Sequence, residues 1–238
     1  MPIPATGNIT LAQIQAEFGG ASPTSLNEYY RGGAYVPNTA RNFGIPSFGV
    51  ISLSNFRSSS KTVVVSYDII GGGGTGGYGV GDGGGSGRAP SGGASAIAGV
   101  VQAAGGIGGA NGAFSRLDQA NRIGKASDYG AGGLAGNNRS AGGNAPSTSY
   151  GAGGGGGGGD AGGTFDSSGN GGEGGFAGQR LTGAFTVVYG TVITVIVGAS
   201  GGASGGQFAG GYGANGFCRL IFDGRTLDFY STQNYTII

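Results

Sequence analysis

Glycine between positions 71 and 216 constrains this chain more than any other feature of its sequence. The stretch opens with four glycines at 71–74, contains an unbroken run at 153–159 and holds most of the 62 glycines of the 238 residues. Glycine loses more backbone entropy on ordering than any other residue, so the default prediction for such a stretch is a flexible linker.

Strand-like runs just before the glycine stretch and just after its middle predict instead that it is ordered. Residues 62–70 and 185–197 are rich in β-branched side chains, with a turn predicted at Tyr189-Gly190 inside the second run. If these two apolar runs pair, they fix both ends of the excursion between them. We therefore expect an ordered domain at 62–238 whose glycine-rich excursion is structured.

Polyproline II helices are the ordered state that suits glycine best. Without side chains such helices can lie close together, and their amides, which are unpaired within a helix, can bond to neighbouring helices. Collagen is disfavoured because it needs glycine at every third residue, whereas 77–82 alternates and 153–159 is pure glycine. The predicted fold is mainly β and irregular, with a β-framed glycine-rich domain packed as a polyproline II bundle.

Composition argues against several functional classes. Histidine is absent, only 10% of residues are charged, the formal net charge is +1, and Cys218 is the single cysteine. No cysteine-based zinc site or intramolecular disulfide can form, and the usual general base is missing. We expect no enzyme, cofactor or metal site, no nucleic-acid partner, and neither a secretory signal nor a membrane span.

Two motifs that resemble ligand-binding motifs do not indicate ligand sites in this chain. The many Gly-x-Gly-x-x-Gly matches arise from composition and none lies in a βαβ unit, and the step Ile123-Gly124-Lys125-Ala126 lacks the Ser/Thr of a phosphate loop. Asp160 follows a glycine run as in a calcium-binding nonapeptide repeat, but Gly162 replaces the apolar position and no tandem copies follow.

Residues 1–61 form a separate zone with short helices. The run 8–20 predicts a helix capped by Thr10, with Gln13 completing a capping box and Gly19 as the stop. The runs 25–33 and 50–57 carry a similar capping pattern and predict shorter helical turns. A zone this small is marginal alone, so we expect it to attach to a partner. The attachment candidates are Leu11, Ile14, Phe18, Tyr29, Tyr30, Leu53 and Phe56.

The carboxyl-terminal end has the sequence pattern of ordinary antiparallel strands. An Asp223-Gly224 pair between two apolar arms predicts a β-hairpin, and residues 235–238 predict a last strand covered by another strand or chain.

Aromatic and arginine residues among the glycines are the best functional signal. One interpretation is structural, with the rings capping the ends of glycine helices or covering the bundle edge. The other is that loops at roughly 88–150 and 160–182 display them to a receptor. The receptor-contact candidates are Phe114, Arg116, Arg122, Tyr129, Arg139, Tyr150, Phe165 and Phe176.

Two parts of the chain resemble known phage proteins. The phrases Gly7-Asn8-Ile9-Thr10-Leu11, Glu17-Phe18-Gly19-Gly20, 25–33, 36–38 and 51–56 resemble a leader found on many tailed-bacteriophage structural proteins. The segments 63–74, 190–198 and 211–222 are similar to glycine-rich domains of phage tail and fibre proteins, including the adhesins that cap the long fibres of T-even-like phages. The resemblance implies a virion component at a tail or fibre tip and, for those adhesins, a polyproline II sandwich.

We therefore expect a non-enzymatic virion protein, made in the host cytoplasm, that contributes to binding a bacterial surface receptor. Its expected partners are other virion proteins, through residues 1–61, and the receptor; homo-oligomerisation is left open. The alternative is a purely architectural component of a baseplate, collar or capsid decoration. Ice binding is disfavoured because no regular Thr or small-residue ladder is visible.

Overall fold

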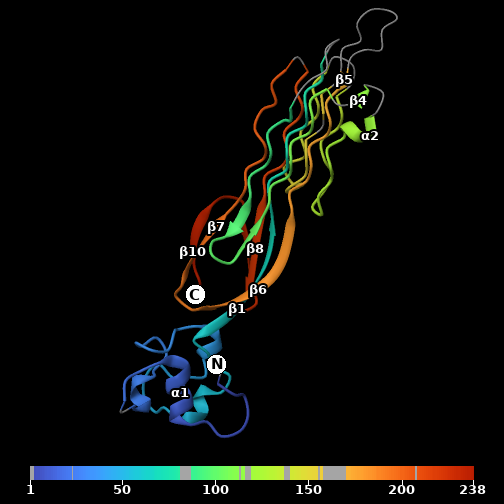
Figure 1. Ribbon diagram of the computed structural model, residues 1–238. Coiled ribbons are helices and arrows are strands. Elements are labelled where there is room, and N and C mark those ends of the chain that lie inside the picture. The colour runs from blue at the N-terminus through green and yellow to red at the C-terminus, as the bar shows by residue number, and fades with distance from the viewer. Residues whose placement is uncertain are drawn as a thin grey trace, which may run out of the picture.

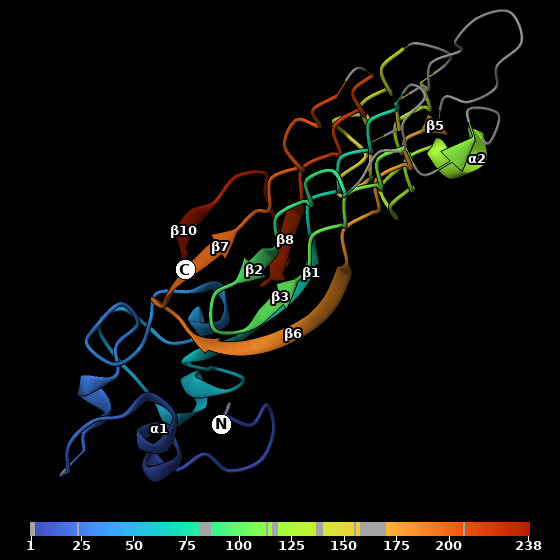
Figure 2. The same ribbon diagram turned by 45° about the horizontal axis from the view of Figure 1, so that its top comes forward.

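The structure is a computed structural model that describes residues 3–22, 24–80, 87–112, 114–115, 119–136, 140–154, 156–157, 170–206 and 208–238. The molecule is elongated (Figure 1). The N-terminal zone lies at one end, a β sandwich follows, and a bundle of extended segments forms the other end (Figure 2). Strands and irregular structure dominate over a few short helices, as the sequence predicts.

The N-terminal zone is built from capped helical turns. Helix α1 (Leu11–Phe18) begins at Thr10, whose side chain forms a capping box with Gln13, and it ends at Gly19. The 3₁₀ turns η1 (Leu26–Glu28) and η3 (Leu53–Phe56) carry the predicted capping boxes, while η2 (Ala40–Asn42) lacks one. The helical turn predicted at 25–33 is shorter than expected, because η1 ends at Glu28. The zone has its own core of Ile3, Ile9, Ile14, Phe18, Tyr29, Val36, Ile45 and Phe56.

The first apolar run pairs with the arm of the second run that precedes the predicted turn, while the arm after the turn belongs to the other sheet. Strand β1 (Thr62–Ile70) runs antiparallel to β6 (Arg180–Val188), from Thr62 opposite Val188 to Ile70 opposite Arg180. Strands β8 (Phe217–Phe222) and β9 (Arg225–Phe229) complete this sheet in the order β6-β1-β8-β9. The excursion between β1 and β6 is therefore fixed at both ends.

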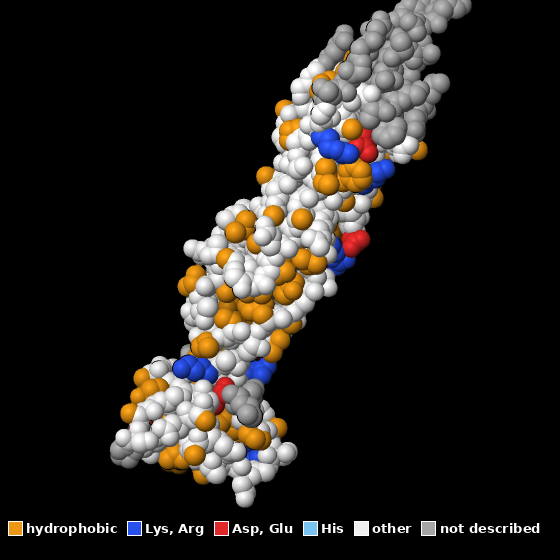
Figure 3. All heavy atoms as spheres, in the orientation of Figure 1, with side chains coloured by type: hydrophobic (Ala, Val, Ile, Leu, Met, Phe, Trp, Pro, Cys, Tyr) orange, Lys and Arg blue, Asp and Glu red, His pale blue; other side chains and the backbone are white. Residues whose placement is uncertain are grey.

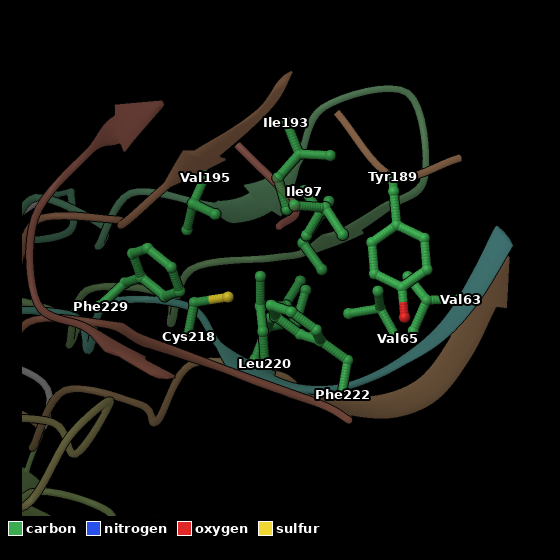
Figure 4. Packing of buried hydrophobic residues seen from close by; sticks show 13 residues of the cluster. Val63, Val65, Ile97, Tyr189, Ile193, Val195, Cys218, Leu220, Phe222 and Phe229 are labelled. Carbon is green, nitrogen blue, oxygen red and sulfur yellow. The ribbon is translucent and has the colours of Figure 1, made fainter. Parts of the chain in front are cut away.

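A second antiparallel sheet covers the inner face of the first. Its order is β10 (Gln233–Thr236), β7 (Val192–Ile196), β2 (Ser95–Ile97) and β3 (Val101–Ala103). Figure 4 shows alternate residues of both sheets meeting between them. The buried core comprises Val63, Val65, Ile69, Ile97, Ala103, Tyr189, Ile193, Val195, Cys218, Leu220, Phe222, Phe229 and Ile237. Burial raises the pKa of the Cys218 thiol to about 12, so this thiol is an unreactive part of the core.

The predicted hairpin joins β8 to β9. Asp223 and Gly224 both have positive φ, 47° and 72°, which is the geometry of a two-residue type I′ turn. The predicted last strand is β10, which begins two residues before the expected start, and Ile237 beyond it is fully buried.

Extended rods, which pair as in a sheet only through isolated bridges at their ends, connect the strands. They cover residues 71–79, 88–94, 104–110, 123–126, 131–136, 141–145, 151–157, 172–179, 198–203 and 208–216, of which residue 155 is not described. The rods run side by side away from the sandwich (Figure 2). A further short pair, β4 (Phe114–Ser115) with β5 (Asn170–Gly171), and helix α2 (Gln119–Arg122) lie towards the far end of the bundle.

Lateral hydrogen bonds repeat every three residues along the central rod, 71–79. Successive N–H groups donate to three neighbours in turn, so every third donates to the same one. The pairs are Gly71 to Gln179, Gly72 to Gly93, Gly73 to Ala214, Gly74 to Phe176, Thr75 to Pro90, Gly76 to Gly211 and Gly77 to Glu173, at 2.8–3.1 Å. Three residues per turn without internal bonds is the geometry of a polyproline II helix, so the rods are the predicted bundle.

Carbonyl groups of the same rod accept bonds from three further rods. The donors Gly106, Gly201 and Gly154 bond to the oxygens of Gly72, Gly73 and Gly74. Among the described residues the central rod thus has six neighbours, and the N–H groups of residues 71–77 are all paired with backbone oxygens.

Glycine is required where rods touch. A Cβ added at Gly73 would overlap the Ala152 carbonyl oxygen, and one at Gly105 would overlap that of Gly92. Side chains instead face outwards at every third position, such as Ala104, Ile107 and Ala110, with glycines between them. The strict glycine period of collagen is absent, as predicted, but a three-residue spacing of side chains occurs within single rods such as 104–110 and loses its phase where one rod ends and the next begins.

Candidate functional surfaces

The connections between rods lie in two groups, one at each end of the bundle. The rods that leave the sandwich reach their far ends near Gly79, Ala110, Gly136 and Gly157, opposite the N-terminal zone (Figure 1). Two described turns, 127–130 and 146–150, lie instead at the near end, against the sheet that contains β1. The predicted contact loops therefore occupy both ends of the bundle.

The two near-end turns bring predicted contact residues together on the outer face of that sheet. Tyr129 and Tyr150 have ring centroids 5.9 Å apart, and Tyr150 stacks on Phe217 of β8 at 5.0 Å. Tyr230, just after β9, lies 5.6 Å from Phe217 and 5.5 Å from Tyr150. These four residues form the junction cluster, in which Phe217 is buried and Tyr230 is 56% exposed.

Ion pairs surround the junction cluster. Tyr129 donates a 2.6 Å hydrogen bond to Asp68 of β1, and Arg180 at the start of β6 donates to both Asp68 and Asp128. The Arg180 guanidinium also lies over the Tyr129 ring, 5.3 Å from its centroid. Turn 127–130 is therefore fastened to both β1 and β6.

A second ion pair lies beside Asp68 on the outer face of the same sheet. Asp68, Arg219 and Asp228 are directly opposite one another on β1, β8 and β9. Arg219 binds Asp228 with two parallel bonds of 2.6 and 2.8 Å. Such a bidentate pair is more rigid than a single contact.

The electrostatics of the junction cluster follow from these contacts. Burial alone would raise the pKa of Asp68, but hydrogen bonds from Arg180 and Tyr129 hold it below its usual value. Burial, together with the bond to the Asp68 carboxylate, raises the pKa of Tyr129 to about 12. The carboxylates also raise the pKa of Arg180. At neutral pH Tyr129 is therefore uncharged, whereas Asp68 and Arg180 beside the cluster are both charged.

The junction cluster and the ion pairs beside it together form a surface of aromatic rings and paired charges. Tyr230 and the side chain of Asp128, 61% exposed, present the polar groups that a ligand could reach. The rings and the partly buried Asp68 are already used to join the bundle to the sandwich. Tyr129 and Tyr150 thus show the structural role that the sequence left open. Sequence reasoning missed Phe217 and Tyr230, although alternation along 217–222 places Phe217 and Arg219 on one face.

The other receptor-contact candidates lie elsewhere. Phe176 is partly buried on the flank of the bundle, with Arg88 6.0 Å from its ring centroid. Arg122 is only 1% exposed and donates to the Gly136 and Gly157 carbonyls, so it joins rods and is not accessible to a receptor. The Phe114 side chain and all of Arg116, Arg139 and Phe165 lie outside the described residues, as does Asp160.

Most attachment candidates form the core of the N-terminal zone. Ile14, Phe18, Tyr29 and Phe56 are fully buried, so a partner cannot reach them directly. Leu11 and Tyr30 are partly buried, and Leu53 is 36% exposed.

The most exposed apolar residues of this zone lie between the candidates. Phe43, Phe48 and Val50 are 67%, 83% and 93% exposed, and they are defined together as the apolar loop. The loop is anchored by buried Ile45 and by the Tyr30 hydroxyl, which donates to the Gly49 carbonyl at 2.5 Å. Sequence reasoning overlooked it, although Gly44, Pro46 and Gly49 around these residues indicate a loop.

Comparison with known proteins identifies no relative. No family model matches the chain, and no curated protein or solved structure matches it. Within the described ranges no helix has the length and apolar character needed to cross a membrane, and no three His, Cys, Asp or Glu side chains gather as a metal site.

Proposed function

We propose that this chain is a bacteriophage virion structural protein at a tail or tail-fibre tip and contributes to binding a host-surface receptor. The observation that carries the proposal is the separation of the N-terminal zone from the far ends of the rods by a bundle packed through its backbone (Figure 1). Such a bundle can present connections at a distance from an attachment point.

Backbone packing makes the connections free to change. The contacts between rods use N–H and C=O groups and leave no room for side chains at positions such as Gly73. Substitutions in a connection that does not join the bundle to the sandwich should therefore leave the packing of the rods unaltered, and variable loops on a rigid scaffold are the usual form of a recognition surface.

The N-terminal zone would join the protein to other virion proteins. Its apolar loop exposes Phe43, Phe48 and Val50 together, and aromatic side chains are enriched at protein interfaces. The sequence resemblance of this zone to phage leaders supports the same assignment.

The direct test uses the purified full chain and the host of the encoding phage. The protein should bind host cells and reduce phage adsorption in competition. Replacing residues 160–169 with a Gly/Ser segment of equal length should abolish binding. The same exchange at the turn 98–100, at the sandwich end of the bundle, is the control and should leave binding intact. Binding that survives the first exchange would count against recognition through that connection.

An architectural role is the alternative, and one observation favours it. Tyr129 and Tyr150, two of the predicted contact residues, are used inside the molecule to hold the bundle on the sandwich. In that case virions would contain the protein at an internal interface and the purified chain would not bind cells. Labelling intact virions with an antibody to the chain separates the two roles.

A further inference from the structure

We propose that the open edge of strand β6 pairs with β6 of a second copy of this chain, so that two sandwiches share one continuous sheet. Strand β6 lies first in the order β6-β1-β8-β9, and Figure 2 shows it at the outer margin of the sandwich. None of its residues is buried, and Gly183 and Ala184 at its middle are exposed. The inference concerns the free protein and does not rest on the proposed virion role.

The β6 edge lacks the features that protect the other edges of the two four-stranded sheets. Strands β3, β9 and β10 have three, five and four residues, whereas β6 has nine. The strand contains neither Pro nor Lys and pairs with β1 without a bulge. Its one charged side chain, Arg180, lies at the end of the strand and is bound to Asp68 and Asp128. A long edge without such protection readily pairs with another strand.

Alternate residues of β6 direct their backbone groups to this edge. The Gly71 N–H donates to the Gln179 carbonyl at one end of the β1–β6 ladder, and the Tyr189 N–H donates to the Lys61 carbonyl at the other, both at 3.0 Å. The register between these ends is continuous, and directly opposite pairs in an antiparallel ladder alternate between bonded and non-bonded. The odd-numbered residues of β6 therefore bond to β1, and the even-numbered ones point their N–H and C=O groups to the open edge. At the middle of the strand these are Thr182, Ala184 and Thr186.

The sequence of β6 fits a second copy of itself in an antiparallel pair centred on Ala184. All nine residues then have a partner, and Thr182 of one copy lies opposite Thr186 of the other. Arg180 lies opposite Val188, so no like charges meet. Such a pair has a two-fold axis and closes at two copies. Because the two strands run in opposite directions, the glycine bundles lie at opposite ends of the pair.

The side chains on the inner face of β6 match in the same register. Leu181, Phe185 and Val187 pack against the sandwich core but are only partly buried, because the sheet ends at this strand. In the pair Leu181 lies opposite Val187 of the second copy, and Phe185 lies opposite Gly183, which leaves room for the ring. A second copy therefore covers apolar side chains as well as the backbone groups of the edge.

The first test is sedimentation equilibrium of the full chain at increasing concentration, combined with hydrogen exchange. The chain should associate reversibly from one copy to two. The amides of Thr182, Ala184 and Thr186 should exchange about tenfold more slowly when about nine-tenths of the chains are paired. The amides of Gly183 and Phe185, which bond to β1, should be slow at every concentration. A chain that stays monomeric up to its solubility limit, or that assembles beyond two copies, overturns the proposal.

Charged substitutions at two exposed positions test the register. Thr182→Lys with Thr186→Lys places like charges opposite each other in the pair and should weaken association about tenfold. Thr182→Glu with Thr186→Glu should do the same. An equimolar mixture of the two double variants should associate again, because residue 182 of one copy meets residue 186 of the other. Denaturant titration of each variant checks that it is folded.

A matched control adds the same charge to other edges of the sandwich. Thr226→Lys with Thr236→Lys changes exposed positions on β9 and β10 and should associate as the wild type does. Equal weakening by this control would show a general effect of charge or pairing through another edge, and it would overturn the assignment to β6. Association that survives Thr182→Lys with Thr186→Lys, or a mixture of the Lys and Glu variants that stays monomeric, would overturn it as well.

Discussion

Tyr129 donates a 2.6 Å hydrogen bond to Asp68 across 61 residues of sequence, joining a turn of the glycine bundle to the outer face of the β sandwich. Asp68 also binds Arg180, which in turn binds Asp128 beside Tyr129. Because Arg180 begins β6 and Asp68 lies in β1, the same carboxylate fastens both strands that leave for the bundle. The orientation of the bundle on the sandwich therefore depends on a few polar contacts.

The first prediction concerns this hydrogen bond. Tyr129→Phe keeps the ring in the junction cluster but removes the donor to a partly buried carboxylate. We expect a loss of about 1–2 kcal/mol in the free energy of unfolding, the usual worth of a bond to a charged group after allowance for partial exposure. Denaturant titration measures it. Tyr212→Phe, at a ring that is 44% exposed, is the control and should be neutral; equal effects of the two changes would contradict the prediction.

The second prediction concerns pH. Because the pKa of Asp68 is lowered in the folded state, its contribution is present above its unfolded pKa of about 3.9 and is lost as pH falls below it. The pKa values of Tyr129 and Tyr189 are raised to about 12, so their contribution is complete below pH ~10, the unfolded pKa, and is lost between there and about 12.

Two measurements check these directions. Ultraviolet titration should show two tyrosines that ionise last, and Tyr129→Phe and Tyr189→Phe should each remove one of them. The stability of Asp68→Asn should depend less on pH below about 4 than that of the wild type. Two late ionisations that persist in either single variant would contradict the assignment.

Local signals in the sequence were sufficient for the ordinary elements. The capping box of Thr10 and Gln13 and the Asp223-Gly224 turn depend on near neighbours, so their patterns predict them directly. The pairing of β1 with β6 followed from two strand-like runs, one before the glycine stretch and one after its middle. Each of these predictions is confirmed.

The arrangement of the rods could not be predicted from the sequence, because most contacts between rods are made by backbone groups. The bond from Gly73 to Ala214 is made by backbone groups, and any rod could offer the same groups. The three-residue spacing of Ala104, Ile107 and Ala110 was available as a signal within one rod, but it does not say which rods are neighbours. For the same reason Arg122 was taken for a surface residue, although it bonds to carbonyls of two other rods.

The third prediction uses a matched pair of glycines. A methyl group at Gly73 would overlap the Ala152 carbonyl oxygen, whereas one at Gly202 would have no atom within 4 Å. Overlap with backbone is costly because the rod must shift, so Gly73→Ala should lose about 3 kcal/mol or more of stability. Gly202→Ala should be neutral or gain about 0.5 kcal/mol, since alanine restricts the unfolded chain. Similar stability of the two variants would refute side-chain-free packing as the reason for glycine.

The fourth prediction concerns the rates of amide hydrogen exchange along one rod. In rod 104–110 the amides of Gly106 and Gly109 donate to the central rod at 2.8 and 2.9 Å, whereas the outward residue Ile107 is 56% exposed. Hydrogen exchange should therefore be slow at Gly106 and Gly109 and fast at Ile107. Uniformly fast exchange along rods 71–79 and 104–110 would mean that the stretch is a mobile spacer.

The last prediction separates attachment from folding in the N-terminal zone. Phe48→Ser combined with Val50→Ser removes two apolar side chains that are 83% and 93% exposed. Exposed positions contribute little to stability, so unfolding should change by less than about 0.5 kcal/mol. If the apolar loop contacts another virion protein, the variant should be missing from purified particles when it replaces the wild type in an infection, as mass spectrometry of the particles would show. Val64→Ser, at a side chain 57% exposed on the outer face of β1, is the control and should be incorporated normally. Normal incorporation of the double variant would place the attachment surface elsewhere, because a folded protein would have reached the particle without this contact.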